Sequence, residues 1–177
     1  MTDDVRIRPY AADDAAALYM AARESVAEVF AWLPWCHAEY SIEEANEWTA
    51  SRPRLFAEGV EYSFAIVDAS GRMIGGCGLN QINRLHRFAN LGYWVRTSQM
   101  GHGVAPSAIR ALARFAFEHT DLIRLEIVCA LGNERSQRAA SKAGATREGV
   151  LNDRLLVHGR PHDAVMYSIV RSTWANA

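Results

Sequence analysis

Glycines concentrated at one predicted turn give the clearest chemical signal in this sequence. Gly101 and Gly103 follow the apolar run Tyr93-Trp94-Val95 and come just before an amphipathic segment that begins at Val104. Main-chain N–H groups at a helix start have no partner within the helix, the helix dipole favours negative charge there, and glycine lets an anion approach the backbone. The pattern indicates binding of a phosphate or pyrophosphate group.

Two common phosphate-binding loops do not fit this turn. No Lys followed by Ser or Thr comes after the glycines, as a P-loop requires, and no third glycine is followed by an acidic ribose ligand. Glycines at a strand-to-helix turn also occur as turn residues alone. The spacing by itself therefore leaves a phosphate site and a plain turn both open.

Histidine and cysteine spacings give no comparable signal for a metal ion. His158 and His162 are four residues apart, but Gly159 and Pro161 lie between them, so we do not expect the two imidazoles on one helix face. The three cysteines lack paired or metal-type spacing: Cys36, Cys77 and Cys129. We interpret them as free thiols of a reducing compartment, and we expect no metal.

The elements that would position the glycine turn alternate between strands and helices. Apolar alternation and β-branched runs predict strands over residues 5–8, 62–68, 73–80, 88–95 and 123–129, with two more over 146–170 joined through 158–161. Helical apolar spacing follows Asp14, Ser41, Gly103 and Asn133, and Ser41 with Glu44 matches a capping box. We interpret Gly92 as a bulge or a close backbone approach. The expected fold class is α/β (α+β mixed), a mixed sheet flanked by helices in one domain over 1–177.

Composition narrows the classes of partner. The 177 residues carry a formal net charge of -1 with no basic block, which argues against nucleic acid or an anionic membrane surface as the main partner. The amino-terminal MTDDVRIRPY lacks the pattern of a signal peptide, and no apolar run approaches membrane-spanning length. We expect a cytoplasmic protein, either a monomer or a homodimer, without direct nucleic-acid or membrane partners.

Further segments extend the pattern over nearly the whole chain. They are Trp32-Leu33-Pro34-Trp35, Leu91-Gly92-Tyr93-Trp94-Val95, Gly101-His102-Gly103-Val104-Ala105, Asn133-x-x-Ser136, Lys142-Ala143-Gly144-Ala145, Glu148-Gly149 and Asp163 ahead of Tyr167. Together they resemble the RimJ/RimL-type branch of the GNAT acetyltransferases. The resemblance implies a mostly antiparallel central sheet of about seven strands, a splayed fourth and fifth strand, about four flanking helices, and acetyl-coenzyme A as co-substrate.

The resemblance also implies roles for individual residues. The coenzyme A pyrophosphate would bind at the loop and helix start formed by Met100, Gly101, His102, Gly103, Val104 and Ala105. The N–H groups near Tyr93, Trp94 and Val95 would pair with the thioester carbonyl and the pantetheine arm, Tyr93 being one of two catalytic candidates. Asn133 and Ser136 would face the pantetheine and the sulfur, with the Ser136 hydroxyl suited to protonate the departing thiolate. The chain departs from the family pattern at two positions. Met100 stands where the family usually has Gln or Arg, and Ala145 stands where it usually has an aromatic residue.

The acceptor cleft would lie between the first two helices, the third and fourth strands and the final hairpin. This implies six candidates for substrate contact: Trp32, Trp35, His37, Glu39, Asn80 and His86. The two tryptophans have an alternative as core residues, and the two histidines have one as surface residues. Leu155 lies where related enzymes place an acid, and no carboxylate of the last third stands out as a base.

We therefore expect an acetyl-coenzyme A-dependent N-acetyltransferase that acts on a primary amine, with the N-terminal α-amine of a protein such as a ribosomal protein as the main expectation. An α-amino group has a reference pKa of roughly 7.7 to 8.0, so part of it is neutral without a base. Two alternatives stay open. One is acetylation of a small amine such as an antibiotic, a polyamine or an amino-acid conjugate; the other is a non-catalytic module that binds acyl-coenzyme A.

Overall fold

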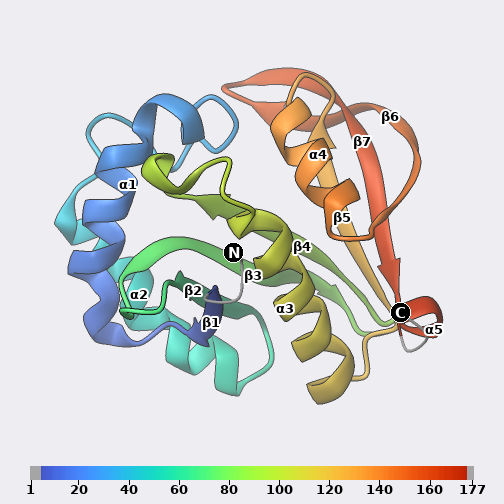
Figure 1. Ribbon diagram of the computed structural model, residues 1–177, viewed down its shortest axis with the longest axis horizontal. Coiled ribbons are helices and arrows are strands. Elements are labelled where there is room, and N and C mark those ends of the chain that lie inside the picture. Colours follow the sequence, from blue (N-terminus) through green and yellow to red (C-terminus); the bar gives the residue numbers. More distant parts are fainter. Residues whose placement is uncertain (1–4, 175–177) are drawn as a thin grey trace.

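Seven strands form one mixed sheet in the order β1-β2-β3-β4-β5-β7-β6 (Figure 1). The computed structural model describes residues 5–174. The strands are β1 (Arg6–Pro9), β2 (Tyr62–Val67), β3 (Met73–Asn83), β4 (Phe88–Val95), β5 (Arg124–Ala130), β6 (Thr146–Val157) and β7 (Arg160–Val170). Within these described residues, only the β4–β5 pair is parallel. The mostly antiparallel seven-stranded sheet expected from the sequence is confirmed.

Helices cover both faces of the sheet. They are α1 (Ala15–Val29), α2 (Ile42–Ala57), α3 (Val104–His119), α4 (Glu134–Lys142) and the four-residue α5 (Arg171–Trp174), with short 3₁₀ turns η1 (Ala12–Asp14) and η2 (Thr97–Gln99). The predicted caps are present: the Ser41 hydroxyl accepts from the Glu44 N–H, and the Asn133 side chain accepts from the Ser136 N–H. These caps fix where α2 and α4 begin.

The alternation of side chains along the strands divides the core in two. Phe64 and Ile66 point to the face covered by α3 and α4, whereas Ala65 and Val67 point to the face covered by α1 and α2. Leu112 of α3 is fully buried in the first cluster, a burial that contributes about 1.5–3 kcal/mol. Each helix pair is thereby held on its own face, with the sheet between them.

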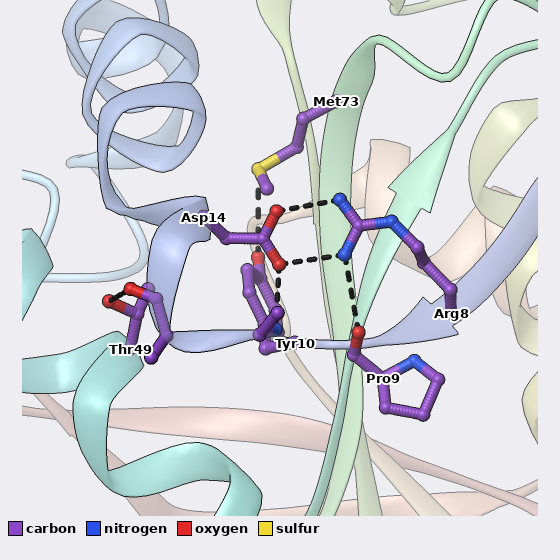
Figure 2. A network of polar contacts seen from close by, with 8 residues as sticks. Arg8, Pro9, Tyr10, Asp14, Thr49 and Met73 are labelled. Atoms are coloured by element: carbon purple, nitrogen blue, oxygen red, sulfur yellow. Dashed lines mark hydrogen bonds and ion pairs between the residues drawn. The ribbon is translucent and has the colours of Figure 1, made fainter.

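A polar network fixes the start of α1 on the sheet (Figure 2). The Arg8 guanidinium donates two hydrogen bonds to the Asp14 carboxylate, at 2.7 and 2.6 Å, and the same carboxylate accepts from the Ala11 N–H at 2.8 Å. The Thr49 hydroxyl donates to the Ala12 carbonyl at 3.2 Å, which joins α2 to the same turn. The direction in which α1 crosses the sheet is set here.

Strands β4 and β5 part after three residue pairs. Their pairing runs from Phe88 opposite Arg124 to Asn90 opposite Glu126 and then stops. Beyond that point β4 continues to pair with β3, and β5 pairs with β7 as far as Ala130. The predicted splay is confirmed, and within the described part of the chain it leaves the β5-facing backbone groups of residues 91–95 without a strand partner.

Two local expectations are wrong. Gly92 lies opposite Gly78 in regular register, and an added side chain there would meet no atom closer than 3.9 Å. The register shifts lie instead between Ile66 and Val67 of β2, between Asn80 and Asn83 of β3, and in β6, including one between Leu151 and Leu155. The last hairpin turns through two residues, His158 and Gly159, rather than through 158–161, because both adopt positive φ angles of 49° and 72°. Two consecutive left-handed residues close a tight hairpin without further loop.

Candidate active site

A cavity of about 1040 Å³ passes through the gap between the parted strands. The end of α1, β4, the loop before α3, β5, the start of α4 and part of β6 contribute to its lining. Most of the site residues expected from the sequence lie on its wall: Trp32, Tyr93, Trp94, Val95, Met100, Gly101, Gly103, Val104, Ala105, Asn133 and Ser136. The tertiary structure brings together residues more than a hundred positions apart in the chain.

One end of the cavity is bordered by main-chain N–H groups at the start of α3. Gly101 and Gly103 have φ angles of 83° and 77°, a left-handed conformation that favours glycine, and a side chain at Gly101 would meet nothing within 4 Å. Within residues 5–174, no protein group accepts a hydrogen bond from the N–H groups of Gly101, Gly103, Val104 or Ala105. We call these four groups the loop amides; together with the helix dipole they favour an anion.

A hydroxyl pair lies where the strands separate. The Tyr93 hydroxyl donates to the Ser136 carbonyl oxygen at 2.9 Å, and its oxygen is 2.9 Å from Ser136 Oγ. Cys129 Sγ is a further 3.1 Å from the same Oγ. Tyr93 comes from β4, Cys129 from β5 and Ser136 from the first turn of α4, so the three groups connect the two sides of the gap.

Burial keeps the Tyr93 phenol and the Cys129 thiol protonated. Desolvation raises the pKa of Tyr93 well above its usual range and raises the pKa of the Cys129 thiol as well. Neither group is therefore an anion near neutral pH, and both remain proton donors. Cys129 was interpreted from the sequence only as a free thiol, which it is. Two features of the sequence could have placed Cys129 at the site. It shares a face of β5 with Ile127, and it comes four residues before Asn133.

Contacts from α1 hold the backbone that leads into the loop amides. Glu24 accepts hydrogen bonds from Arg96 Nε at 2.5 Å and from the Ser98 N–H at 3.0 Å. One turn later, Glu28 accepts from the Thr97 hydroxyl at 2.7 Å. Desolvation acts to raise the pKa of Glu24, but the hydrogen bonds from Ser98 and Arg96 outweigh it and lower the value to about 2. Sequence reasoning missed these contacts because carboxylates spaced along a helix usually face solvent.

The other end of the cavity lies between the segment after α1 and the last hairpin. Trp32 reaches across to the loop after β5, where a side chain on Gly132 would come within 3.3 Å of its ring. Farther out, the His158 imidazole is 2.8 Å from the Phe30 carbonyl oxygen and its ring lies 4.3 Å from the Phe30 ring. Figure 1 shows the two segments approaching one another at the top of the sheet.

Other sequence candidates do not line the cavity. Trp35 packs edge-on against Tyr40 and Trp94. His37 is 3.0 Å from a Glu44 carboxylate oxygen and, with Glu39, lies in the segment between α1 and α2. Three candidates remain. His102 lies next to the loop amides, and His86 lies in the exposed turn between β3 and β4. The Asn80 side-chain oxygen Oδ1 accepts a hydrogen bond from the Asn90 side chain at 2.9 Å. Asn90 and Gln81 take positions on the wall in place of Asn80.

The part of the chain that is described contains no group of three or more His, Cys, Asp or Glu side chains placed to hold a metal ion. Over the same residues, no helix has the length and apolar character needed to cross a membrane. His162 lies opposite Leu155 in the β6–β7 pairing, apart from the His158 contact with Phe30.

A parted parallel strand pair beside free amides at a helix start is the arrangement expected of an acyl-coenzyme A-dependent transferase. Comparison with known families agrees: residues 4–146 match the model described as the acetyltransferase (GNAT) domain. This chain belongs to that GNAT acetyltransferase family.

Several named acetyltransferases are similar to this chain in sequence or in fold. YdaF of Bacillus subtilis (strain 168), provisionally named a ribosomal N-acetyltransferase, is 36% identical over 104 residues, 59% of this chain and 57% of YdaF. The ribosomal-protein-serine acetyltransferase of Escherichia coli (strain K12) is 26% identical over 136 residues, 77% of this chain and 75% of that protein. A spermidine N(1)-acetyltransferase of Vibrio cholerae is 25% identical over 119 residues, 67% of this chain and 69% of that protein. The solved structure of RimL, a ribosomal L7/L12 alpha-N-protein acetyltransferase in complex with coenzyme A, has the same fold, with a TM-score of 0.86 at 24% identity over 94% of each chain.

Proposed function

We propose that this protein transfers the acetyl group of acetyl-coenzyme A to the α-amine at the N-terminus of a protein, such as a ribosomal protein. The observation that carries the proposal is the single cavity that connects the loop amides with the Tyr93–Ser136 hydroxyl pair through the parted strands. The names of YdaF and of the Escherichia coli relative support a ribosomal-protein acceptor.

The residues present fit the coenzyme. Among residues 5–174 the loop amides have no acceptor, and they lie at a positive helix end, which suits a pyrophosphate. From there the wall continues along Val95 and Tyr93 to Ser136, a path for an extended arm between the strands. When bound, acetyl-coenzyme A supplies an acetyl group activated as a thioester.

The chain's own groups can assist transfer at the parted strands. The unpaired β4 amides beyond Asn90 are available to hydrogen-bond a carbonyl oxygen and to stabilise negative charge that develops on it. Ser136 Oγ holds a proton within the network of Tyr93 and Cys129, and we assign to it protonation of the departing sulfur. Tyr93, kept neutral by burial, orients Ser136 through both of its hydrogen bonds.

Charges on the wall favour an α-amine over a more basic amine. Only Glu28 and Glu134 among the described residues contribute carboxylates to the cavity lining; Glu28 accepts from Thr97, and Glu134 pairs with Arg138 at 3.0 Å. Leu155 occupies the wall near the last hairpin without a titratable group. A protein α-amine, with a pKa of roughly 7.7 to 8.0, is partly neutral without a base, whereas a lysine amine near 10.4 is almost wholly protonated.

A competition between acceptors tests the proposal. Purified protein and acetyl-coenzyme A would be incubated with a ribosomal-protein N-terminal peptide, with the same peptide blocked at its N-terminus but carrying an internal lysine, and with spermidine. Thiol release and mass spectrometry would report transfer. We expect acetylation of the free N-terminus alone. Transfer to spermidine but not to peptides would favour the small-amine alternative, and coenzyme binding without turnover on any amine would favour a non-catalytic module.

A further inference from the structure

A stripe of cations borders the coenzyme end of the cavity and has no part in the chemistry described so far. Arg135, Arg138 and Lys142 lie three and four residues apart on α4, so they share one helix face. All three line the cavity. Because the whole chain has a formal net charge of -1, this concentration of positive charge is local.

Two of the three cations are not neutralised by the protein. Arg138 pairs with Glu134, but within residues 5–174 no carboxylate lies within ion-pair distance of Arg135 or Lys142. The Lys142 carbonyl oxygen accepts a hydrogen bond from Arg110 of α3 at 3.1 Å, which holds the end of α4 beside α3 and adds a fourth cation nearby. Cations left unpaired beside a cavity favour an anionic ligand.

The position of Arg135 connects this stripe to the loop amides. Its guanidinium lies 3.5 Å from the Met100 sulfur, and Met100 directly precedes Gly101. A methionine side chain offers no hydrogen-bond donor to a phosphate. Beside Met100, the side-chain donor is therefore Arg135 of α4 rather than the residue that directly precedes Gly101.

We propose that Arg135 and Lys142 form a subsite for the phosphate monoester of coenzyme A, the 3′-phosphate on its ribose. This inference rests on the proposed function, since it assumes that the loop amides hold the pyrophosphate. A phosphate monoester carries close to two negative charges near neutral pH and lies one ribose away from the pyrophosphate. An arginine guanidinium and a lysine ammonium supply charge-assisted hydrogen bonds to such a group. The subsite distinguishes coenzyme A from analogues that end in a bare ribose.

Calorimetric titration with coenzyme A and with 3′-dephospho-coenzyme A tests the subsite. We expect the wild-type protein to bind coenzyme A roughly tenfold more tightly, a ratio appropriate to two exposed charge contacts. In the double variant Arg135→Gln/Lys142→Gln the affinity for coenzyme A should fall to that for the dephospho form, whose own affinity should not change. Arg147→Gln, an exposed arginine of β6 away from the cavity, is the matched control and should keep the preference.

The outcomes separate the two proposals. Equal binding of both ligands by the wild type, or a preference that survives in the double variant, would overturn the subsite and leave the acetyltransferase proposal intact, because both ligands carry the thiol arm and the pyrophosphate. Binding of neither ligand would overturn both. Arg135 and Lys142 are exposed, so unchanged thermal melting of the double variant would show that the fold is retained.

Discussion

Tyr93, Ser136 and Cys129 illustrate how burial, rather than residue type, sets chemistry at the residue scale. Each of these side chains is ordinary at a protein surface. Inside the gap, desolvation holds the phenol and the thiol in their neutral forms, and Ser136 Oγ lies 2.9 Å from the phenol oxygen and 3.1 Å from the thiol sulfur. When such a hydroxyl gives its proton to the leaving sulfur, hydrogen bonds from its protonated neighbours can stabilise the negative charge left on its oxygen.

Removal of the Ser136 hydroxyl tests its role as a proton donor. Ser136→Ala should lower kcat by roughly tenfold to a hundredfold, at or below the lower end of the general-acid range because a thiolate is a good leaving group. The dissociation constant for acetyl-coenzyme A should change little. Steady-state kinetics and titration calorimetry separate the two effects, and equal loss in both would make Ser136 a binding residue. Tyr93→Phe combined with Ser136→Ala should be less than additive, since the two side chains act together.

The loop amides depend on the left-handed backbone at Gly103. Gly103→Val should cost about 1–2 kcal/mol of stability and should also weaken coenzyme A binding, because a β-branched residue disfavours a φ of 77°. Gly144→Val is the matched control, since Gly144 has a φ of 91° just after α4 and lies outside the cavity lining. Similar destabilisation with weakened binding in Gly103→Val alone supports the phosphate site; equal affinities would contradict it.

At the scale of elements, α1 does more than cover the sheet. Over slightly more than one turn it supplies Glu24, Ser25 and Glu28 to the segment 96–98, which leads into the loop amides. Trp32, a few residues farther along, lines the acceptor end of the same cavity. One helix thus positions both the coenzyme loop and part of the acceptor wall.

Loss of one of these contacts should be visible in coenzyme binding. Glu24→Gln removes the charge that holds Arg96 and weakens the hydrogen bond from the Ser98 N–H. We expect a roughly three- to tenfold weaker affinity for acetyl-coenzyme A, the equivalent of one hydrogen bond, with kcat nearly unchanged. Glu47→Gln, at an exposed position of α2 outside the cavity, should have no effect. If both variants bind like the wild type, α1 does not position the loop.

The last three strands share an ion pair whose pH dependence can be stated. Hydrogen bonds from Arg124, at 2.7 and 2.5 Å, and from Ser168, at 2.6 Å, lower the pKa of Glu148 from 4.5 to about 2. A lowered folded-state pKa stabilises the fold above the unfolded value, and this contribution is lost as the pH falls from 4.5 towards 2.

Glu148→Gln should therefore destabilise the protein by about 1 kcal/mol at neutral pH, a value reduced by the partial exposure of the pair. The difference from wild type should shrink through the acid range. Urea unfolding at a series of pH values measures it, with Glu118→Gln, exposed on α3, as the reference variant. A difference that stays constant with pH would show that packing, and not charge, is responsible.

At the scale of the whole molecule, the cavity exists because segments far apart in the chain close around the parted strands. The segment after α1 meets the β6–β7 hairpin through Phe30 and His158, and Trp32 meets the loop after β5 at Gly132. These contacts join opposite ends of the sequence above the gap. The acceptor wall is thus a tertiary feature rather than a motif.

Substitutions of Trp32 and Trp35 test whether the segment after α1 forms part of the acceptor wall. Trp32→Ala should raise KM for the acceptor by roughly three- to tenfold, the equivalent of one aromatic contact, with little change in unfolding temperature. Trp35→Ala should instead lower stability by about 1–3 kcal/mol, because its ring packs against Tyr40 and Trp94 and does not itself line the cavity. Steady-state kinetics with the acceptor peptide and thermal unfolding of both variants distinguish the roles. An altered acceptor preference in Trp35→Ala alone would reverse the assignment.

Local chemistry determined much of this protein before any tertiary contact was considered. Alternation predicted the strands, Ser41 and Asn133 predicted the starts of α2 and α4, and the motif set identified the family, because each of these signals lies within a few residues of chain. The loop amides belong to the same class of signal, since glycine spacing at a helix start is itself a local property.

Only the tertiary structure decided which candidates share one wall. It placed Trp32 on the cavity and left Trp35, His37 and His86 away from it, and it brought Cys129, Glu24 and Arg135 to the site from positions with no distinctive motif. The physical reason is that strand register, helix direction and burial arise from long-range packing. Residue type and local spacing determine the chemistry that a side chain can offer, and tertiary packing determines which other groups it contacts.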